Sequence, residues 1–129
     1  MKRLLHKFWK SEGQEEIYTP KGMDMDFELT YRSLVVGTLS LRDGEWAFKY
    51  SDAFKRQDMI KPLTDFPDVE KVYTMNELFP FFVERIPGLG QPKVQEIIKK
   101  EKIDEHNEAA LLKRFGRITI ANPFQLQVV

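Results

Sequence analysis

The sequence predicts an α+β domain in which an antiparallel β-meander and C-terminal strands form a sheet, with a cluster of short helices packed on it. Three observations lead to this prediction. Residues 26–50 alternate apolar and polar side chains, residues 77–115 show helical spacing between proline and glycine breaks, and residues 117–129 return to short strand-like runs. Period-two alternation is typical of half-buried strands, and a spacing of three to four residues is typical of amphipathic helices. With 129 residues, 42% of them hydrophobic, the chain is long enough for one domain with its own core.

Residues 1–25 are predicted to form an N-terminal extension and linker that precede a domain at 26–129. Within residues 1–10, helical spacing relates four apolar side chains among basic ones: Leu4, Leu5, Phe8 and Trp9. A short helix of this kind packs on its own domain, docks on a partner or lies on a membrane surface, and the pattern leaves these alternatives open. Residues 11–25 contain Gly13, Pro20 and Gly22 among polar groups, which predicts a linker.

Residues 26–50 are predicted to form a three-stranded antiparallel meander. Apolar residues alternate from Phe27, an apolar run extends over Leu34–Leu41, and aromatic residues alternate from Trp46 to Tyr50. The Asp43-Gly44 pair between two β-prone runs is a strong hairpin signal. Gly37 interrupts the middle strand, which predicts a bulge or a close approach of another backbone.

Residues 51–73 are predicted to be irregular, with a helical turn at Asp52–Arg56 and a short strand at Val69–Tyr73. Thr74 to Glu77 has the spacing of a capping box, but Pro80 favours a helix that begins near Phe79, since proline fits best in a first turn.

Two further helices and two closing strands complete the prediction. Pro92 begins a helix that extends to Lys102, and Asp104 is expected to cap a helix that ends at Gly116. Ile118–Ala121 and Phe124–Val129 are expected to be strands, separated by Asn122-Pro123.

Composition limits the function classes. Lys and Arg together number 20 and balance 20 Asp and Glu, so the net charge gives no reason to expect direct nucleic-acid binding. There is no cysteine, and the two histidines, His6 and His106, lack the spacing of metal ligands. No apolar run approaches the roughly 20 residues of a spanning helix. We therefore expect a cytoplasmic protein with no membrane association, metal or cofactor.

The segment Gly88-Leu89-Gly90, followed by Lys93, superficially resembles a phosphate-binding loop. A P-loop needs four residues between its glycines and then Gly-Lys-Ser/Thr, and both the spacing and the hydroxyl residue differ here. We expect a tight turn between two helices, no ATP binding and no enzymatic activity. Aromatic residues on the third strand (Trp46, Phe48 and Tyr50) either pack in the core or stack on single-stranded nucleic acid.

Three stretches in a characteristic order resemble HipA-type serine/threonine kinases. "LTYRSLVVGTLSLRDGEWAFKYS" resembles the opening strands of that family, and "LLKRFGRITIANPFQL" resembles its Leu-Leu…Gly…Gly-Ala segment. "LFPFFVERIPGLG" resembles its Phe-Phe-x-x-Leu-Leu-Pro-Glu-Gly stretch, with Arg85-Ile86-Pro87-Gly88 where Leu-Leu-Pro-Glu-Gly is usual. The resemblance spans about residues 26–129.

The resemblance implies a free-standing N-terminal subdomain, because the family's ATP site and catalytic residues lie further along a longer chain. Such a subdomain is similar to the small HipS-like subunit of HipB–HipS–HipT toxin–antitoxin systems. The implied function is a non-catalytic, antitoxin-like subunit that binds and restrains a HipT/HipA-type kinase, with a HipB-like helix-turn-helix DNA-binding protein as a further partner. The alternative is a small nucleic-acid-binding or repressor-complex module.

Partner binding is expected to depend on a few aromatic anchors, because large apolar side chains dominate interface energetics. The sequence offers Trp9, Phe54 and Phe79 as candidates. Phe54 is chosen because it lies in the irregular stretch after the meander, where no regular core face awaits it.

Overall fold

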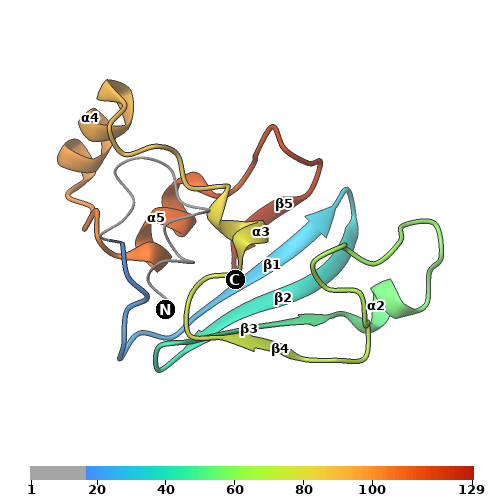
Figure 1. Cartoon of the computed structure of the whole chain (residues 1–129). Helices are drawn as coiled ribbons and strands as arrows, with labels where there is room; N and C mark the ends of the chain where they lie inside the picture. Colours follow the sequence, from blue (N-terminus) through green and yellow to red (C-terminus); the bar gives the residue numbers. More distant parts are fainter. Residues whose placement is uncertain (1–16) are drawn as a thin grey trace.

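A five-stranded antiparallel sheet organises residues 17–129, the part of the chain that the computed structural model describes (Figure 1). Its strands are β1 (Met25–Tyr31), β2 (Leu34–Arg42), β3 (Glu45–Tyr50), β4 (Tyr73–Met75) and β5 (Gln125–Val128). The strand order is β4-β3-β2-β1-β5, so β4 and β5 form the two edges. The sheet and its short helices confirm the predicted α+β class.

The β1–β2–β3 meander forms where the sequence predicts it. Asp43 and Gly44, between β2 and β3, both have positive φ (47° and 80°), the backbone that a two-residue hairpin turn needs. The β1–β2 register shifts between Leu29 and Thr30, opposite the stretch that holds Gly37. A Cβ atom on Gly37 would lie 2.5 Å from the carbonyl oxygen of Lys49. Both the bulge and the close backbone approach are therefore confirmed.

One face of the sheet carries the core. Directly paired residues on neighbouring strands are fully buried on it, among them Phe27 with Leu39 and Leu39 with Phe48. The helices are α2 (Asp52–Lys55), α3 (Pro80–Val83), α4 (Pro92–Glu101) and α5 (Glu108–Phe115). In Figure 1, α3 and α5 lie on the same side of the sheet, and α4 lies farthest from it. The Phe82 ring of α3 packs 5.8 Å from Phe48, which fixes α3 on β3.

The opposite face is polar and takes no part in the core. Its paired residues include Glu28 with Thr38, Ser40 with Ala47, and Ala47 with Thr74. An antiparallel sheet commonly buries one face and leaves the other to solvent. No helix within residues 17–129 is long and apolar enough to cross a membrane.

Residues 17–20 differ from the predicted linker because they pack on the domain. Ile17 is buried in the core, and Tyr18 forms a parallel bridge with Asn107. The indole Nε1 of Trp46 donates a 3.0 Å hydrogen bond to Thr19 Oγ1, which donates a 2.8 Å bond to buried Glu108. Long-range contacts of this kind leave no local pattern, so glycine and proline spacing alone suggested a linker.

Three local predictions were wrong. Asp104 does not cap the last helix: Asn107 does, accepting a 3.0 Å bond from the amide of Ala110, because the chain first turns at Asp104. The predicted strand at Val69–Tyr73 begins only at Tyr73, whereas the helix expected to begin near Phe79 is confirmed as α3, with Phe79 as its N-cap. Ile118–Ala121 is irregular rather than a strand.

Candidate partner-binding surface

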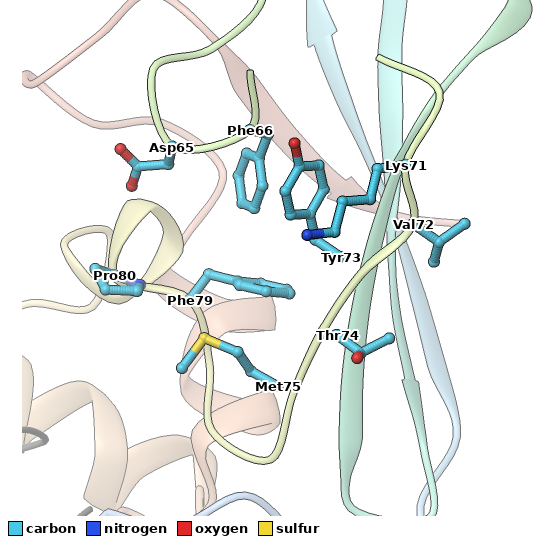
Figure 2. A pocket seen from close by; sticks show the side chains of 9 residues that line it. All are labelled: Asp65, Phe66, Lys71, Val72, Tyr73, Thr74, Met75, Phe79 and Pro80. Atoms are coloured by element: carbon cyan, nitrogen blue, oxygen red, sulfur yellow. The ribbon is translucent and has the colours of Figure 1, made fainter. Parts of the chain in front are cut away.

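A groove of about 440 Å³ lies beside the edge strand β4. Figure 2 shows Phe66 and Phe79 on one side of it and the stretch from Lys71 to Thr74 on the other. The Nζ of Lys71 lies 4.9 Å from the centre of the Tyr73 ring. The groove is therefore an aromatic hollow with a cation over one of its rings.

Phe79 is one of the two predicted anchors within the described residues. It lines this groove but is only 5% exposed. It takes the N-cap position of α3, and its ring packs at 5.2 Å from Phe66 and 6.3 Å from Phe82. These ring contacts pack the Phe79 side chain within its own domain. Its side chain therefore forms a wall of the groove and does not project toward a partner.

Phe54 is a core residue, and the reasoning that placed it at an interface was wrong. Its side chain is 2% exposed and stacks on Tyr50 with ring centres 4.7 Å apart. Ser51 caps α2 by accepting a 3.0 Å bond from the amide of Phe54, which turns the ring inward. One turn of helix thus supplies the core face that the sequence did not reveal. The third candidate, Trp9, lies outside the described residues.

The aromatic residues of β3 are all buried. Trp46 and Phe48 are 0% exposed and Tyr50 is 3% exposed. The Tyr50 hydroxyl donates to the carbonyl oxygen of Phe66 and accepts a 2.8 Å bond from the amide of Leu63. Burial raises the pKa of Tyr50 to about 12, against the lowering effect of the bond from Leu63. Of the two alternatives, core packing is confirmed, and these rings are not available to stack bases.

At the other edge of the sheet, the chain between α5 and β5 folds into a compact loop. The amide of Leu126 donates a 2.9 Å hydrogen bond to the carbonyl oxygen of Arg117, so the two ends of the loop meet. We call residues 117–126, which include the first two residues of β5, the C-terminal loop. Loops closed in this way pack on themselves and frequently carry function.

Arg85 holds this loop from beneath. It follows α3 and is 3% exposed. Its guanidinium donates to four acceptors: the carbonyl oxygens of Gly116 (2.9 Å), Arg117 (3.4 Å) and Phe124 (2.9 Å), and Asn122 Oδ1 (3.0 Å). None of these acceptors is a carboxylate. The Asn122 side-chain amide also donates to Glu84 Oε1 at 3.5 Å. The successive residues Glu84 and Arg85 therefore both bond Asn122.

Burial lowers the pKa of Arg85 to about 10, while the charge of Glu84 opposes that shift. The guanidinium therefore keeps its proton at neutral pH. A charge removed from water is costly unless hydrogen bonds replace its hydration. The four loop acceptors provide that replacement at Nη1 and Nη2, whereas Nε is buried without a hydrogen-bond partner, so the loop and the two amino groups stabilise one another.

The C-terminal loop presents apolar side chains to solvent. Ile118 is 57% exposed and Ile120 is as exposed as in an extended peptide (109%). They lie two residues apart on a segment whose base is fixed by Arg85. Loops on a rigid scaffold commonly carry binding residues, which makes Ile118 and Ile120 candidates for a recognition surface.

The sequence did not identify this surface. Ile118–Ala121 was interpreted as a strand, and Arg85 was noted only as part of the Arg85-Ile86-Pro87-Gly88 stretch that differs from the family pattern. Glu84 and Arg85 interrupt an otherwise apolar run from Leu78 to Ile86, but this pattern does not show which of the two side chains is buried.

The glycine-rich segment is a turn between α3 and α4. The amide of Gln91 donates a 3.3 Å bond to the carbonyl oxygen of Gly88, and a Cβ atom on Gly90 would meet nothing within 4 Å. The predicted tight turn is confirmed. Across residues 17–129 no group of three or more acidic or histidine side chains is placed to hold a metal ion.

A known family model covers most of the elements described above. The family model described as the HipA N-terminal domain matches residues 28–120. The match takes in most of β1, the whole of β2, β3 and β4, and helices α2 to α5. No curated protein matches the chain.

Proposed function

This chain belongs to the HipA N-terminal domain family, and we propose that it is a non-catalytic regulatory subunit that binds and restrains a HipA/HipT-type serine/threonine kinase. A helix-turn-helix DNA-binding protein of the HipB type is a further expected partner of such a complex. The proposal rests on family membership together with one structural observation, the exposed isoleucines of the C-terminal loop.

The isoleucines support a protein partner because of where they lie and how they are held. Ile118 and Ile120 sit on a loop whose ends are joined by a hydrogen bond and whose base is fixed by Arg85. A few well-placed apolar side chains supply most of the affinity in many interfaces, at about 2 kcal/mol or more each. A kinase surface with an apolar depression would complement them.

The subunit restrains the kinase if it binds one conformational state of the kinase more tightly than the other. A ligand shifts a conformational equilibrium only by the difference between its affinities for the two states. The subunit must therefore bind an inactive arrangement of the kinase more tightly than the active one. This requirement is met without any catalytic group on the subunit.

The test is a binding and activity experiment with a HipA-type kinase chain that lacks this domain. We expect the wild-type protein to bind it in isothermal titration calorimetry and to reduce its phosphorylation rate. Ile120→Asp should weaken binding at least tenfold, about 1.4 kcal/mol, and release the kinase from restraint.

Met59→Asp is the matched control, because Met59 is 92% exposed but lies on the stretch after α2, far from the C-terminal loop in the sequence. We expect it to leave both measurements unchanged. Wild-type protein that neither binds nor slows the kinase would refute the proposal. Equal losses in the two variants would remove the C-terminal loop from the interface.

A further inference from the structure

The two limbs of the C-terminal loop are joined through a single side chain. Arg85 Nη1 bonds the carbonyl oxygens of Gly116 and Arg117, where the loop begins. Its Nη2 bonds Asn122 Oδ1 and the carbonyl oxygen of Phe124, where the loop returns. A guanidinium is planar and rigid, so its two amino groups fix the separation of the limbs they contact.

Burial makes this arrangement hard to replace. Arg85 is 3% exposed, its bond to Gly116 is buried, and its bonds to Arg117, Asn122 and Phe124 are partly buried. The acceptors are backbone carbonyls and one amide oxygen, all turned inward toward the guanidinium. Ile118 and Ile120, between the two limbs, are exposed. Arg85 and the exposed Ile118 and Ile120 are therefore parts of the same loop structure.

We infer that Arg85 is a positioning residue, which holds the C-terminal loop in its binding conformation before the kinase arrives; this inference rests on the proposed function. Ordering an interface segment on binding reduces affinity, and a segment that is already ordered avoids that loss. Arg85 contributes to affinity without touching the partner, because it sets where Ile118 and Ile120 stand.

Apart from Arg85, the contacts of the loop with the rest of the domain lie mainly on its returning limb, where Asn122 also bonds Glu84. Phe124 contacts Tyr31 and Phe81, with ring centres 5.9 and 6.3 Å apart, which anchors the returning limb alone. On the outgoing limb, Gly116 and Arg117 accept hydrogen bonds from Arg85, and Arg117 accepts another from Leu126 of the returning limb. Loss of Arg85 should therefore free the part of the loop that carries the isoleucines.

Two substitutions separate positioning from simple filling of space. Arg85→Met keeps an unbranched side chain of similar length but removes all donors. Arg85→Lys keeps the charge and one donor group, which cannot bridge both limbs as a planar fork does. If Arg85 only fills space, both variants should behave like the wild type in the loop.

The first measurement is amide hydrogen exchange on the full chain without kinase. We expect exchange within residues 117–126 to accelerate at least tenfold in Arg85→Met and Arg85→Lys, while the amides of β2 and β3 keep their protection. Unchanged exchange in the C-terminal loop would overturn the inference. Should Arg85→Met lose the protection of β2 and β3, Arg85→Lys alone decides the outcome.

The second measurement is a double-mutant cycle on kinase binding. We expect Ile120→Ala to weaken binding at least fivefold in the wild-type background and less than twofold in the Arg85→Lys background, because the isoleucine is no longer held in position. Additive effects would overturn the inference and leave the proposed function intact. A wild-type protein that does not bind the kinase would overturn the proposed function and the kinase-facing role of Arg85 with it, whereas the exchange result would still show whether Arg85 holds the loop.

Discussion

The two edges of the sheet are stabilised by different chemistry. At the β4 edge, Phe66 packs its ring against five aromatic neighbours, which are Phe48, Tyr73, Phe79, Phe81 and Phe82, with centre distances from 4.5 to 6.2 Å. At the β5 edge, the buried cation Arg85 holds the C-terminal loop by hydrogen bonds. The first edge buries its aromatic cluster while Val72 beside it stays exposed, and the second exposes Ile118 and Ile120.

This difference separates stability from recognition. Aromatic residues that fill one another's space contribute to folding, and their substitution should lower the free energy of unfolding. Exposed isoleucines contribute little to folding, so they are available for recognition. A residue type alone does not reveal which role it has, as Phe54 and Phe79 illustrate by their burial.

The largest expected effect is at the β4 edge. Phe66→Ala should lower the free energy of unfolding by about 3–5 kcal/mol, because it removes a ring that is 2% exposed and leaves a cavity. Urea denaturation followed by circular dichroism measures this. Ile120→Ala is the control at the β5 edge and should change stability by no more than about 0.5 kcal/mol. Similar losses in both variants would abolish the contrast between the edges.

Tyr50→Phe should have the next largest effect, since it leaves the amide of Leu63 and the carbonyl oxygen of Phe66 without their partner. An unpaired buried group costs about 1–3 kcal/mol, and two are created here. The same urea titration measures this loss, with Phe66→Ala as the reference for the β4 edge. A loss below about 0.5 kcal/mol would show that water reaches both groups.

The contribution of Tyr50 should also depend on pH. The pKa of Tyr50 is about 12 in the folded protein against an ordinary 10.0, so the native state holds the proton more tightly than the unfolded state. The added stability is complete below pH 10 and decreases as pH rises through 12. The stability difference between wild type and Tyr50→Phe should therefore shrink in that window. A constant difference up to pH 12 would contradict the burial of the hydroxyl.

At the β5 edge, Gly116→Ala should cost about 1–3 kcal/mol through overpacking. A Cβ atom at Gly116 would lie 2.5 Å from the carbonyl oxygen of Leu112, whereas its φ of −86° is unstrained. The start of the C-terminal loop must shift to accept it. Thermal unfolding measures the loss, and hydrogen exchange should show its effect centred on residues 116–118. An unchanged melting temperature would mean that the end of α5 tolerates displacement.

The smallest effect is expected for Gly90→Ala, which lies at neither edge. Its Cβ atom would meet nothing within 4 Å, and Gly90 is not among the glycines of positive φ. The change in stability should be within about 0.5 kcal/mol. Thermal unfolding beside Gly116→Ala provides the matched comparison. A loss as large as that of Gly116→Ala would indicate that the turn between α3 and α4 is under constraint.

Local signals in the sequence were enough for the meander and for α4. Asp43-Gly44 specifies its turn through the backbone of two residues, and Pro92 begins α4 at the residue that the sequence indicates. These signals need no knowledge of the rest of the chain. The predicted strand at Phe124–Val129 is likewise confirmed as β5, one residue shorter at each end.

The candidate surface depends on contacts that no local pattern encodes. Arg85 bonds residues 31 to 39 positions further along the chain, and the sequence cannot show that its side chain points inward. Ile118 and Ile120 alternate as in a strand, but the bonds from Arg85 hold their segment in a loop. Phe54 was placed at a surface because a single turn of helix at α2 has no long apolar pattern.

The bond between Thr19 and Glu108 has a consequence for the order of synthesis. The two residues are 89 positions apart, and the first described residues of the chain meet the start of α5 through them. A ribosome that has released Thr19 must therefore extend the chain through nearly the whole domain before this contact can form. Strand β1 likewise waits for β5 as its second neighbour. We expect stalled nascent chains to expose residues 17–20 to protease until α5 has emerged, and protection at shorter lengths would contradict this.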